Sequence, residues 1–226
     1  MGNRPIFTLD PRLQACSEFV RDNCKIVDVG TDHAYLPIWL AKKNKISHAL
    51  AVDINEAPLT IADKNIAKYH VENKVLSRLS NGLNNVSPTE VDDIIISGMG
   101  GETIIQILQD THWIRNTEKH LILQPMTADH LLREFLFKNN FKIIKEVVVK
   151  ANRHVYTVML AKFTTEPVVW NNIDIYTGTL SECISKYTEE YFHRIVRHLT
   201  NQKLASNSPP SLDDVISTLN SLTNQN

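Results

Sequence analysis

Short apolar segments alternate along this chain with longer segments whose apolar residues recur at helical spacing. The apolar segments predict five strands, at residues 25–29, 47–53, 75–79, 94–96 and 120–123. A helical pattern follows each of them except the third. The fourth strand is apolar throughout, as expected for a parallel strand that is buried on both faces. The alternation therefore predicts an α/β fold with a mostly parallel sheet and helices on both faces.

The two ends of this core have their own patterns. Two longer β-rich segments, 141–149 and 155–163, are joined by a short polar link and predict a terminal hairpin that brings the sheet to seven strands with one antiparallel strand. Before the first strand, Thr8 or Asp10 is placed to cap a short helix that has Pro11 in its first turn.

The composition changes after residue 164, and a polar helical pattern follows. Apolar residues recur close to heptad spacing between residues 178 and 205, at Leu180, Ile184, Tyr187, Tyr191, Ile195 and Leu199. The segment 206–210 contains two prolines and breaks this pattern, and a second amphipathic segment runs from Leu212 to Leu222. We expect two domains, 1–165 as the α/β domain and 166–226 as a helical, coiled-coil-like hairpin.

Composition narrows the class of protein without deciding its function. The chain has 226 residues, of which 42% are hydrophobic and 22% charged, as in ordinary globular proteins. It shows no secretory pattern and no apolar run that would span a membrane, and its three cysteines have no C-x-x-C spacing. We therefore expect a cytoplasmic protein without a metal site. The net charge of −1 means that any nucleic acid must be held by a local basic patch.

The turn after the first strand carries the most specific signal. Asp28 lies near the end of the strand, and Gly30 would let the backbone approach a ligand closely at the point where α/β sheets bind nucleotides. Asp32 stands where a dinucleotide-binding turn has its second glycine, and a carboxylate there would repel a pyrophosphate. S-adenosylmethionine has an adenosine, a sulfonium and an ammonium but no phosphate. The turn therefore favours a methyltransferase over a nicotinamide-dependent dehydrogenase.

Each acidic or aromatic residue of this turn also has a simpler interpretation. Asp28 either faces the ligand's ammonium or anchors the turn. Asp32 either binds the ammonium or the substrate, or caps the next helix. His33 and Tyr35 either line the pocket or are first-turn residues that face solvent.

The ends of the second and third strands supply a candidate adenosine site. Asp53 lies a little over 20 residues beyond Gly30, where an acidic residue typically accepts hydrogen bonds from ribose hydroxyls. Ile54 follows and is placed to pack on the adenine. Asn81, which precedes Gly82, is placed to bind the adenine edge, although Asn-Gly is also a common turn.

The fourth and fifth strand ends carry the candidate reacting centre. Ser97, Gly98 and Met99 begin a glycine-rich segment, continued by Gly100 and Gly101, that would let a planar substrate lie against open backbone amides at a helix start. The alternative is a flexible loop before a helix. Gln124, in the segment Gln-Pro-Met, can both donate to and accept from a nucleobase on the opposite wall. The candidate catalytic set is Asp32, Ser97, Gly98, Met99 and Gln124, and Ser97 and Gly98 are also expected to touch the cofactor.

These segments resemble the bacterial tRNA adenine-N1 methyltransferase family that modifies adenosine 22, the TrmK-like family. The similarity covers Pro-Arg-Leu-Gln-Ala at 11–15, Asp-Val-Gly-Thr-Asp-His-Ala-Tyr-Leu-Pro at 28–37, Ala-Val-Asp at 51–53, Asn-Gly-Leu at 81–83, Ile-Ser-Gly-Met-Gly-Gly at 96–101 and Leu-Gln-Pro-Met at 123–126. It extends to about Phe163, and the polar helical tail follows the family's arrangement. One departure is Asn81, where the family commonly has an aspartate.

The resemblance implies a Rossmann-like methyltransferase fold, S-adenosylmethionine as methyl donor, no metal, tRNA as substrate and no obligate protein partner. Adenine N1 already has a lone pair, so the enzyme must mainly align the reacting atoms. N1 lies on the Watson–Crick edge, so the base must be splayed out of the RNA. Asp32 is then placed to stabilise the positive charge that develops on adenine or to accept from its amino group.

Charge patterning indicates where RNA would contact the chain. Five basic residues against Glu146 alone lie between residues 138 and 153, and other candidates are Arg4, Arg12, Lys42, Lys43, Lys45, Lys186, Arg194, Arg197 and Lys203. Two alternatives stay open at this level. One is a methyltransferase for a small molecule or a protein, and the other is a binding module for S-adenosylmethionine or tRNA without turnover.

Overall fold

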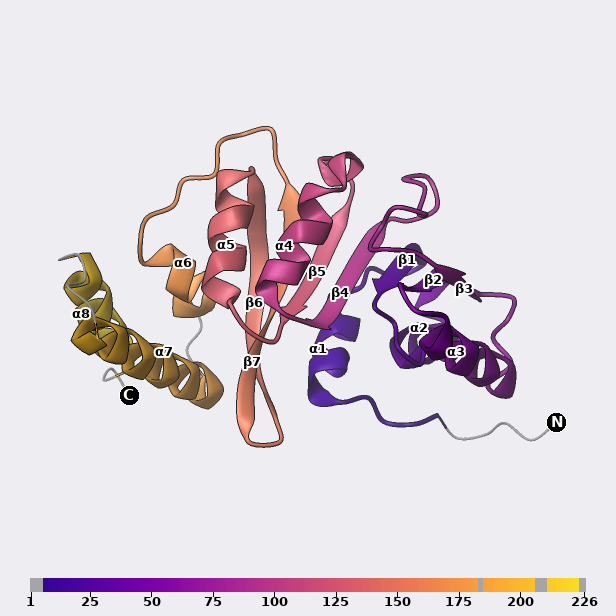
Figure 1. Ribbon diagram of the computed structural model, residues 1–226, viewed down its shortest axis with the longest axis horizontal. Helices are drawn as coiled ribbons and strands as arrows, with labels where there is room; N and C mark the ends of the chain where they lie inside the picture. Colours follow the sequence, from indigo (N-terminus) through magenta and orange to yellow (C-terminus); the bar gives the residue numbers. More distant parts are fainter. Residues whose placement is uncertain (1–5, 183–184, 206–210, 224–226) are drawn as a thin grey trace.

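The computed structural model describes residues 6–182, 185–205 and 211–223. Its centre is a seven-stranded sheet with the strand order β3-β2-β1-β4-β5-β7-β6 (Figure 1). Strand β7 pairs antiparallel with both β5 and β6, so it runs opposite to the other six strands. The strands are β1 (Cys24–Val29), β2 (Ile46–Asp53), β3 (Val75–Leu79), β4 (Asp93–Met99), β5 (His120–Pro125), β6 (Phe141–Ala151) and β7 (His154–Phe163). The prediction of a mostly parallel sheet closed by a hairpin is confirmed.

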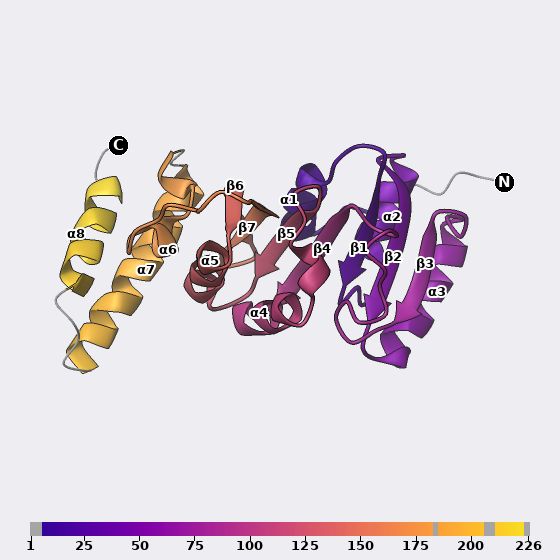
Figure 2. The same cartoon turned by 90° about the horizontal axis from the view of Figure 1, so that it is seen from above.

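Helices cover both faces of this sheet, as the sequence predicts. Figure 2 shows α1 on one side and α4 and α5 on the other. The first core joins α1 (Pro11–Phe19), α2 (Tyr35–Lys42) and α3 (Glu56–Lys68) to the sheet, and the second joins α4 (Gly101–Gln109) and α5 (Asp129–Lys138). The apolar run of β4 serves both cores, because Ile95 packs in the first and Ile94 and Ile96 pack in the second.

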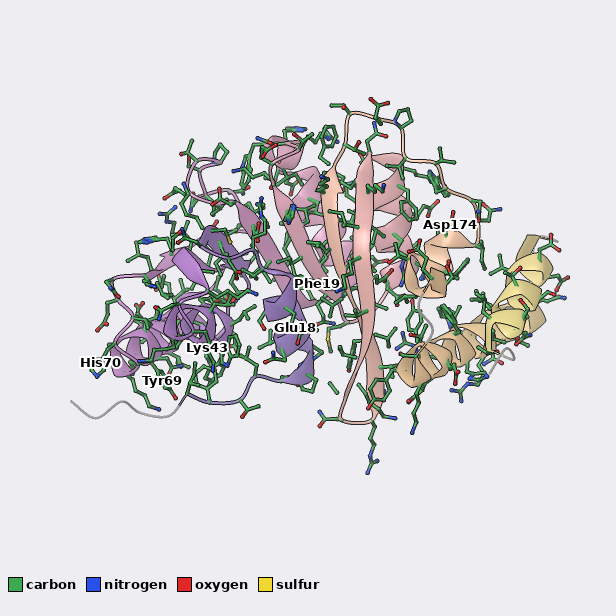
Figure 3. The ribbon with its side chains drawn as sticks, turned by 180° about the vertical axis from the view of Figure 1, so that it is seen from behind. Glu18, Phe19, Lys43, Tyr69, His70 and Asp174 are labelled. Atoms are coloured by element: carbon green, nitrogen blue, oxygen red, sulfur yellow. The ribbon has the colours of Figure 1, made fainter. Side chains whose placement is uncertain are left out.

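Helix α1 is built as its sequence predicts. The carboxylate of Asp10 accepts from the backbone amide of Arg12 at 2.9 Å, which caps the helix, and Pro11 occupies its first position. Figure 3 shows α1, with Glu18 and Phe19 labelled, lying across the face of the sheet that is hidden in Figure 1. The helix thereby brings Arg12 close to the ends of the central strands.

The described residues of the C-terminal part form one short α-helix, one 3₁₀ turn and two longer helices. These are α6 (Asp174–Thr177), the 3₁₀ turn η2 (Leu180–Glu182), α7 (Lys186–Ala205) and α8 (Ser211–Thr223). The helix expected over 178–205 therefore begins later, because Gly178 ends α6 with a φ of 51°. Two of the predicted apolar positions, Ile184 and the side chain of Leu212, lie outside the described residues.

A buried charge network ties helix α7 to the α/β domain. Arg133 of α5 donates to Glu146 of β6 at 2.6 Å and to the hydroxyl of Tyr191 of α7 at 2.9 Å. The Tyr191 hydroxyl in turn donates to Asp129 at 2.7 Å. Arg133 and Tyr191 are both completely buried, so this network is inside the protein and not on its surface. No helix within the described ranges combines the length and apolarity required to cross a membrane.

Candidate active site

The strand order creates a crevice between β1 and β4. The chain runs outward from β1 through β2 to β3 and then returns to place β4 beside β1. In open α/β sheets, such a reversal leaves a crevice at the carboxyl ends of the strands, where ligands bind. The loops that follow β1, β2, β3, β4 and β5 therefore meet at one edge, and they carry the residues that the sequence singles out.

One cavity of about 460 Å³ brings together the predicted adenosine-binding residues. Its lining includes Gly30, Asp53, Ile54, Asn81, Gly82, Leu83, Ser97, Gly98 and Met99. The carboxylate of Asp53 accepts from the backbone amide of Asn55 at 3.0 Å, and the Asp32 amide lies 3.4 Å from its other oxygen. Asp53 is thus fixed by the backbone at the cavity wall, where it can accept hydrogen bonds from a ligand.

A second cavity, of about 360 Å³, adjoins the first because Gly30, Ser97 and Gly98 line both. Its other walls include Arg12, Asp28, Asp32, Tyr35 and Gln124. We call the two cavities together the strand-end groove. The groove thus unites residues of the first turn with the glycine-rich segment and the end of β5.

Asp28 is the unusual carboxylate of the groove. It is buried, and the Thr31 hydroxyl donates to it at 2.7 Å. Burial raises the pKa of Asp28 to about 7; the Thr31 hydrogen bond opposes this shift, and the charge of Asp53 adds to it. Within the described ranges, no cation is among the groups that set this pKa. A cationic ligand group at this wall would stabilise the ionised form.

Two glycines shape the floor of the groove. Gly30 has a φ of 70° and Gly98 a φ of 76°, a backbone region that other residues rarely adopt. A Cβ on Gly30 would overlap the terminal methyl of Met99, whereas a Cβ on Gly98 would meet open space. The Met99 side chain therefore lies over Gly30, and the backbone of Gly98 is accessible from the groove.

The loops after β4 and β5 hold each other in place. The Gln124 side chain is buried; its amide oxygen accepts from Gly98 N at 3.0 Å, and its amide nitrogen donates to Pro125 O at 2.8 Å. Gln124 thus fixes the Gly98 loop, and its expected direct contact with a nucleobase stays a prediction. The Gly101 amide donates to Thr127 O at 2.8 Å, so it is not open to a ligand as the sequence suggested.

The remaining first-turn residues divide between the groove and its rim. Asp32 has a φ of 54°, and its side chain is 68% exposed at the groove, 3.4 Å from the ring nitrogen Nε2 of His33. The N-cap position of α2 belongs to Ala34, which excludes the capping alternative for Asp32. Tyr35 lines the second cavity, whereas His33 is absent from the described lining of both.

Some groove residues were not found from the sequence. Thr31 is the hydrogen-bond partner of Asp28, and its position three residues later in the turn was the available signal. Thr103 and Ile107 line the first cavity from successive turns of α4, which their spacing of four residues could have indicated. Arg12, which we expected only as an RNA contact, lines the second cavity.

Comparison with known proteins identifies the family. A family model described as "Methyltransferase domain" matches residues 9–159, which is more than half of the chain. The chain belongs to this methyltransferase family. The match spans all of the groove residues from Arg12 to Gln124, so the methyltransferase domain contains the complete groove.

Relatives of the methyltransferase domain extend over the tail as well. A tRNA (adenine(22)-N(1))-methyltransferase from Bacillus subtilis is 29% identical over 195 residues, 82% of each chain. Streptococcus pneumoniae Sp1610, solved in complex with S-adenosyl-L-methionine, has a TM-score of 0.84 and 28% identity, covering 96% of this chain and 100% of its own. M. capricolum TrmK, solved with S-adenosyl-homocysteine, has a TM-score of 0.77 and 27% identity over 96% of both chains. The Rossmann-like methyltransferase fold is thereby confirmed.

Proposed function

We propose that this protein transfers a methyl group from S-adenosylmethionine to N1 of an adenosine in tRNA, and that adenosine 22 is the target. The observation that carries the proposal is the strand-end groove, in which Asp28 and Asp53 present two carboxylates beside accessible glycine backbone. Such a groove suits a cationic adenosine ligand without phosphate. The named activity of the Bacillus subtilis relative supports the choice of substrate.

The residues present fit S-adenosylmethionine. Asp53 would accept from the ribose hydroxyls, and Ile54 and Leu83 would pack on the adenine, with Asn81 at its edge. The buried carboxylate of Asp28 would face the ammonium, because no cation of the described residues is among the groups that set its pKa. The backbone at Gly98 would admit the ligand closely, since a Cβ there would meet open space, whereas the Met99 side chain lies over Gly30.

The chain's own residues have a modest chemical task in this reaction. S-adenosylmethionine, when bound, supplies the electrophilic methyl group. The N1 lone pair of neutral adenine is already a nucleophile, so the residues of the groove must orient the base and exclude water. Gln124 holds the Gly98 loop against which the base would lie. Asp32, exposed at the groove rim, would accept from the adenine amino group and stabilise the positive charge that forms on the ring.

RNA would approach over exposed basic residues. Lys142, Lys145 and Arg153 are exposed, whereas Lys138 pairs with Glu134 and Lys150 pairs with Glu190. The first three residues are therefore the better candidates for phosphate contacts, and RNA binding through them would weaken with salt.

We also propose that residues 1–165 and 166–226 form two domains and that the protein acts in the cytoplasm.

The test is methyl transfer from labelled S-adenosylmethionine to two tRNA transcripts that differ only at position 22, adenosine or guanosine. We expect 1-methyladenosine in the first transcript and none in the second. Asp32→Ala should lose turnover and keep its affinity for S-adenosylmethionine. Cofactor binding without transfer to either transcript would overturn the tRNA assignment and leave a methyltransferase for another substrate or a binding module.

A further inference from the structure

A third cavity lies on the other side of the Gln124–Met126 segment from the groove. It has a volume of about 290 Å³, and residues of β5, α5, β7, α6 and α7 and of the loop after β5 line it, among them Met126, His130, Tyr156, Tyr176, Arg194 and His198. The helix that carries Tyr176 is α6, which lies between the sheet and helices α7 and α8 (Figure 3, where Asp174 marks α6). This cavity is therefore built jointly by the methyltransferase domain and the C-terminal helices.

The wall between this cavity and the groove is formed by three side chains in contact. Arg12, which lines the groove, has a guanidinium nitrogen 2.9 Å from the sulfur of Met126. The same guanidinium lies over the ring of Tyr156, 5.3 Å from its centroid. Met126 and Tyr156 both line the third cavity. An RNA strand with one nucleotide in the groove would thus reach the third cavity by crossing a single layer of side chains.

The walls of the third cavity offer flat rings and positive charge. His130 of α5 and Tyr176 of α6 stack with their ring centroids 5.8 Å apart and their planes 10° from parallel. Arg194 and His198 lie one turn apart on α7. Asp129 accepts from the Tyr191 hydroxyl and pairs with Arg194 at 3.6 Å, and Arg194 also donates to the Val155 carbonyl at 2.9 Å. The Arg194 side chain is still 43% exposed, and a guanidinium has five N–H donors, so it keeps donors for a phosphate.

We propose that the third cavity holds a nucleotide of the RNA next to the methylated adenosine, with its base on the His130–Tyr176 rings and its phosphate at Arg194. This inference rests on the proposed function. Proteins bind single-stranded nucleotides by stacking bases on aromatic rings and holding the backbone with cations. The nucleotide next to a base splayed into the groove stays covalently attached to it and therefore lies nearby, and the third cavity is where such a neighbour would lie.

The first experiment measures the affinity for unmodified tRNA in the presence of S-adenosyl-homocysteine, so that no turnover occurs. Tyr176→Ala should weaken tRNA binding roughly 5- to 150-fold, the range for the loss of one stacked base. Tyr176→Phe keeps the ring and should bind as the wild type does. Tyr187→Ala is the matched control, because Tyr187 is an exposed tyrosine on α7 outside the lining of the cavity. All variants should keep wild-type affinity for S-adenosylmethionine.

A second pair of variants tests the cation. Arg194→Gln should weaken tRNA binding and reduce its salt dependence, whereas Arg115→Gln, at an exposed arginine that is neither a predicted RNA contact nor part of the cavity lining, should do neither. Melting temperatures identify variants that unfold. Wild-type tRNA affinity for both Tyr176→Ala and Arg194→Gln, or equal losses in the controls, would overturn the inference. A wild-type protein that neither binds nor methylates tRNA would instead show that the proposed function has failed, before any variant is compared.

Discussion

Two buried carboxylates of this molecule have opposite surroundings. Glu146 accepts twice from the guanidinium of Arg133, within a network that also satisfies Tyr191 and Asp129. Asp28 has the Thr31 hydroxyl as its side-chain partner and faces the groove. A buried charge is costly unless it is paired. Arg133 compensates the charge of Glu146 within the fold, whereas no cation of the described residues is among the groups that set the pKa of Asp28. The contrast in their charged partners identifies Glu146 as part of a structural network and Asp28 as a candidate ligand-binding group.

Removing the cation of the paired site should have the largest effect. Arg133→Met leaves Glu146 buried without its partner, and we expect a loss of about 3–5 kcal/mol in the free energy of unfolding. Urea denaturation measures this loss. The double variant Arg133→Met with Glu146→Leu should recover most of it, because apolar residues of similar size can replace a buried pair. A double variant that is no more stable than Arg133→Met would contradict the assignment of the cost to the unpaired charge.

Changing the groove should reduce binding and leave the fold intact. Asp53→Asn keeps an oxygen for the Asn55 amide but loses the charge that would face the ribose. We expect S-adenosylmethionine to bind about 10- to 100-fold more weakly, the value of hydrogen bonds to a charged group. Calorimetric titration measures the affinity. Asp63→Asn, at an exposed acid of α3 bonded to Ser77, is the control and should bind normally.

The pKa of Asp28 predicts a pH dependence of smaller size. If only the ionised form binds the ammonium, a pKa of about 7 makes the contribution of Asp28 to affinity about tenfold weaker at pH 6 than at pH 8. Titrations at both pH values, compared with Asp28→Asn, isolate this contribution from the ligand's own titration. Equal pH dependence in the two proteins would rule out Asp28 as the titrating group.

Ionisation of Asp28, which would favour ligand binding, should lower the stability of the ligand-free protein. The raised pKa means that the folded state holds its proton more tightly than the unfolded state does. The wild type should therefore lose stability relative to Asp28→Asn as the pH rises from about 4 to about 7. Urea denaturation over this range provides the measurement.

The smallest effect is expected from an exposed pair that joins β6 and α7, two of the three elements that the buried network links. Lys150 of β6 and Glu190 of α7 lie 2.8 Å apart, and both side chains are 37% exposed. Lys150→Gln should cost less than about 1 kcal/mol of unfolding free energy, because solvent screens such pairs. A loss as large as that of Arg133→Met would mean that burial does not explain the comparison.

The sequence predicted the groove better than it predicted the charge network. Groove residues follow strands, and the strands are visible as apolar runs, so Asp53 and Gly98 could be placed from order along the chain. Arg133 and Glu146 lie 13 residues apart and Arg133 and Tyr191 lie 58 apart, and nothing local shows that the tail will cover them. The sequence therefore does not distinguish Glu146, which lies among five basic residues between 138 and 153, from a charge on the protein surface.

The later start of α7 and the role of Gln124 were missed for the same physical reason. A Cβ on Gly178 would overlap the Glu146 carboxylate, so the close approach of a distant strand requires glycine just before the apolar pattern begins at Leu180. Gln124 looks free in the sequence because its partner, the Gly98 amide, belongs to another strand end. Local patterns predict elements, whereas contacts between elements decide which polar groups stay available.

The strand order also fixes when each part can form during synthesis. All of the residues that line the groove have been made once Gln124 leaves the ribosome, but β5 then still lacks its neighbour β7. Strand β7 enters between β5 and β6 only after residue 163 has been made. A nascent chain halted between these points would carry the complete set of groove residues beside an unpaired, apolar strand edge. During that interval the unpaired edge of β5 exposes the growing polypeptide to aggregation, and a chaperone would protect it.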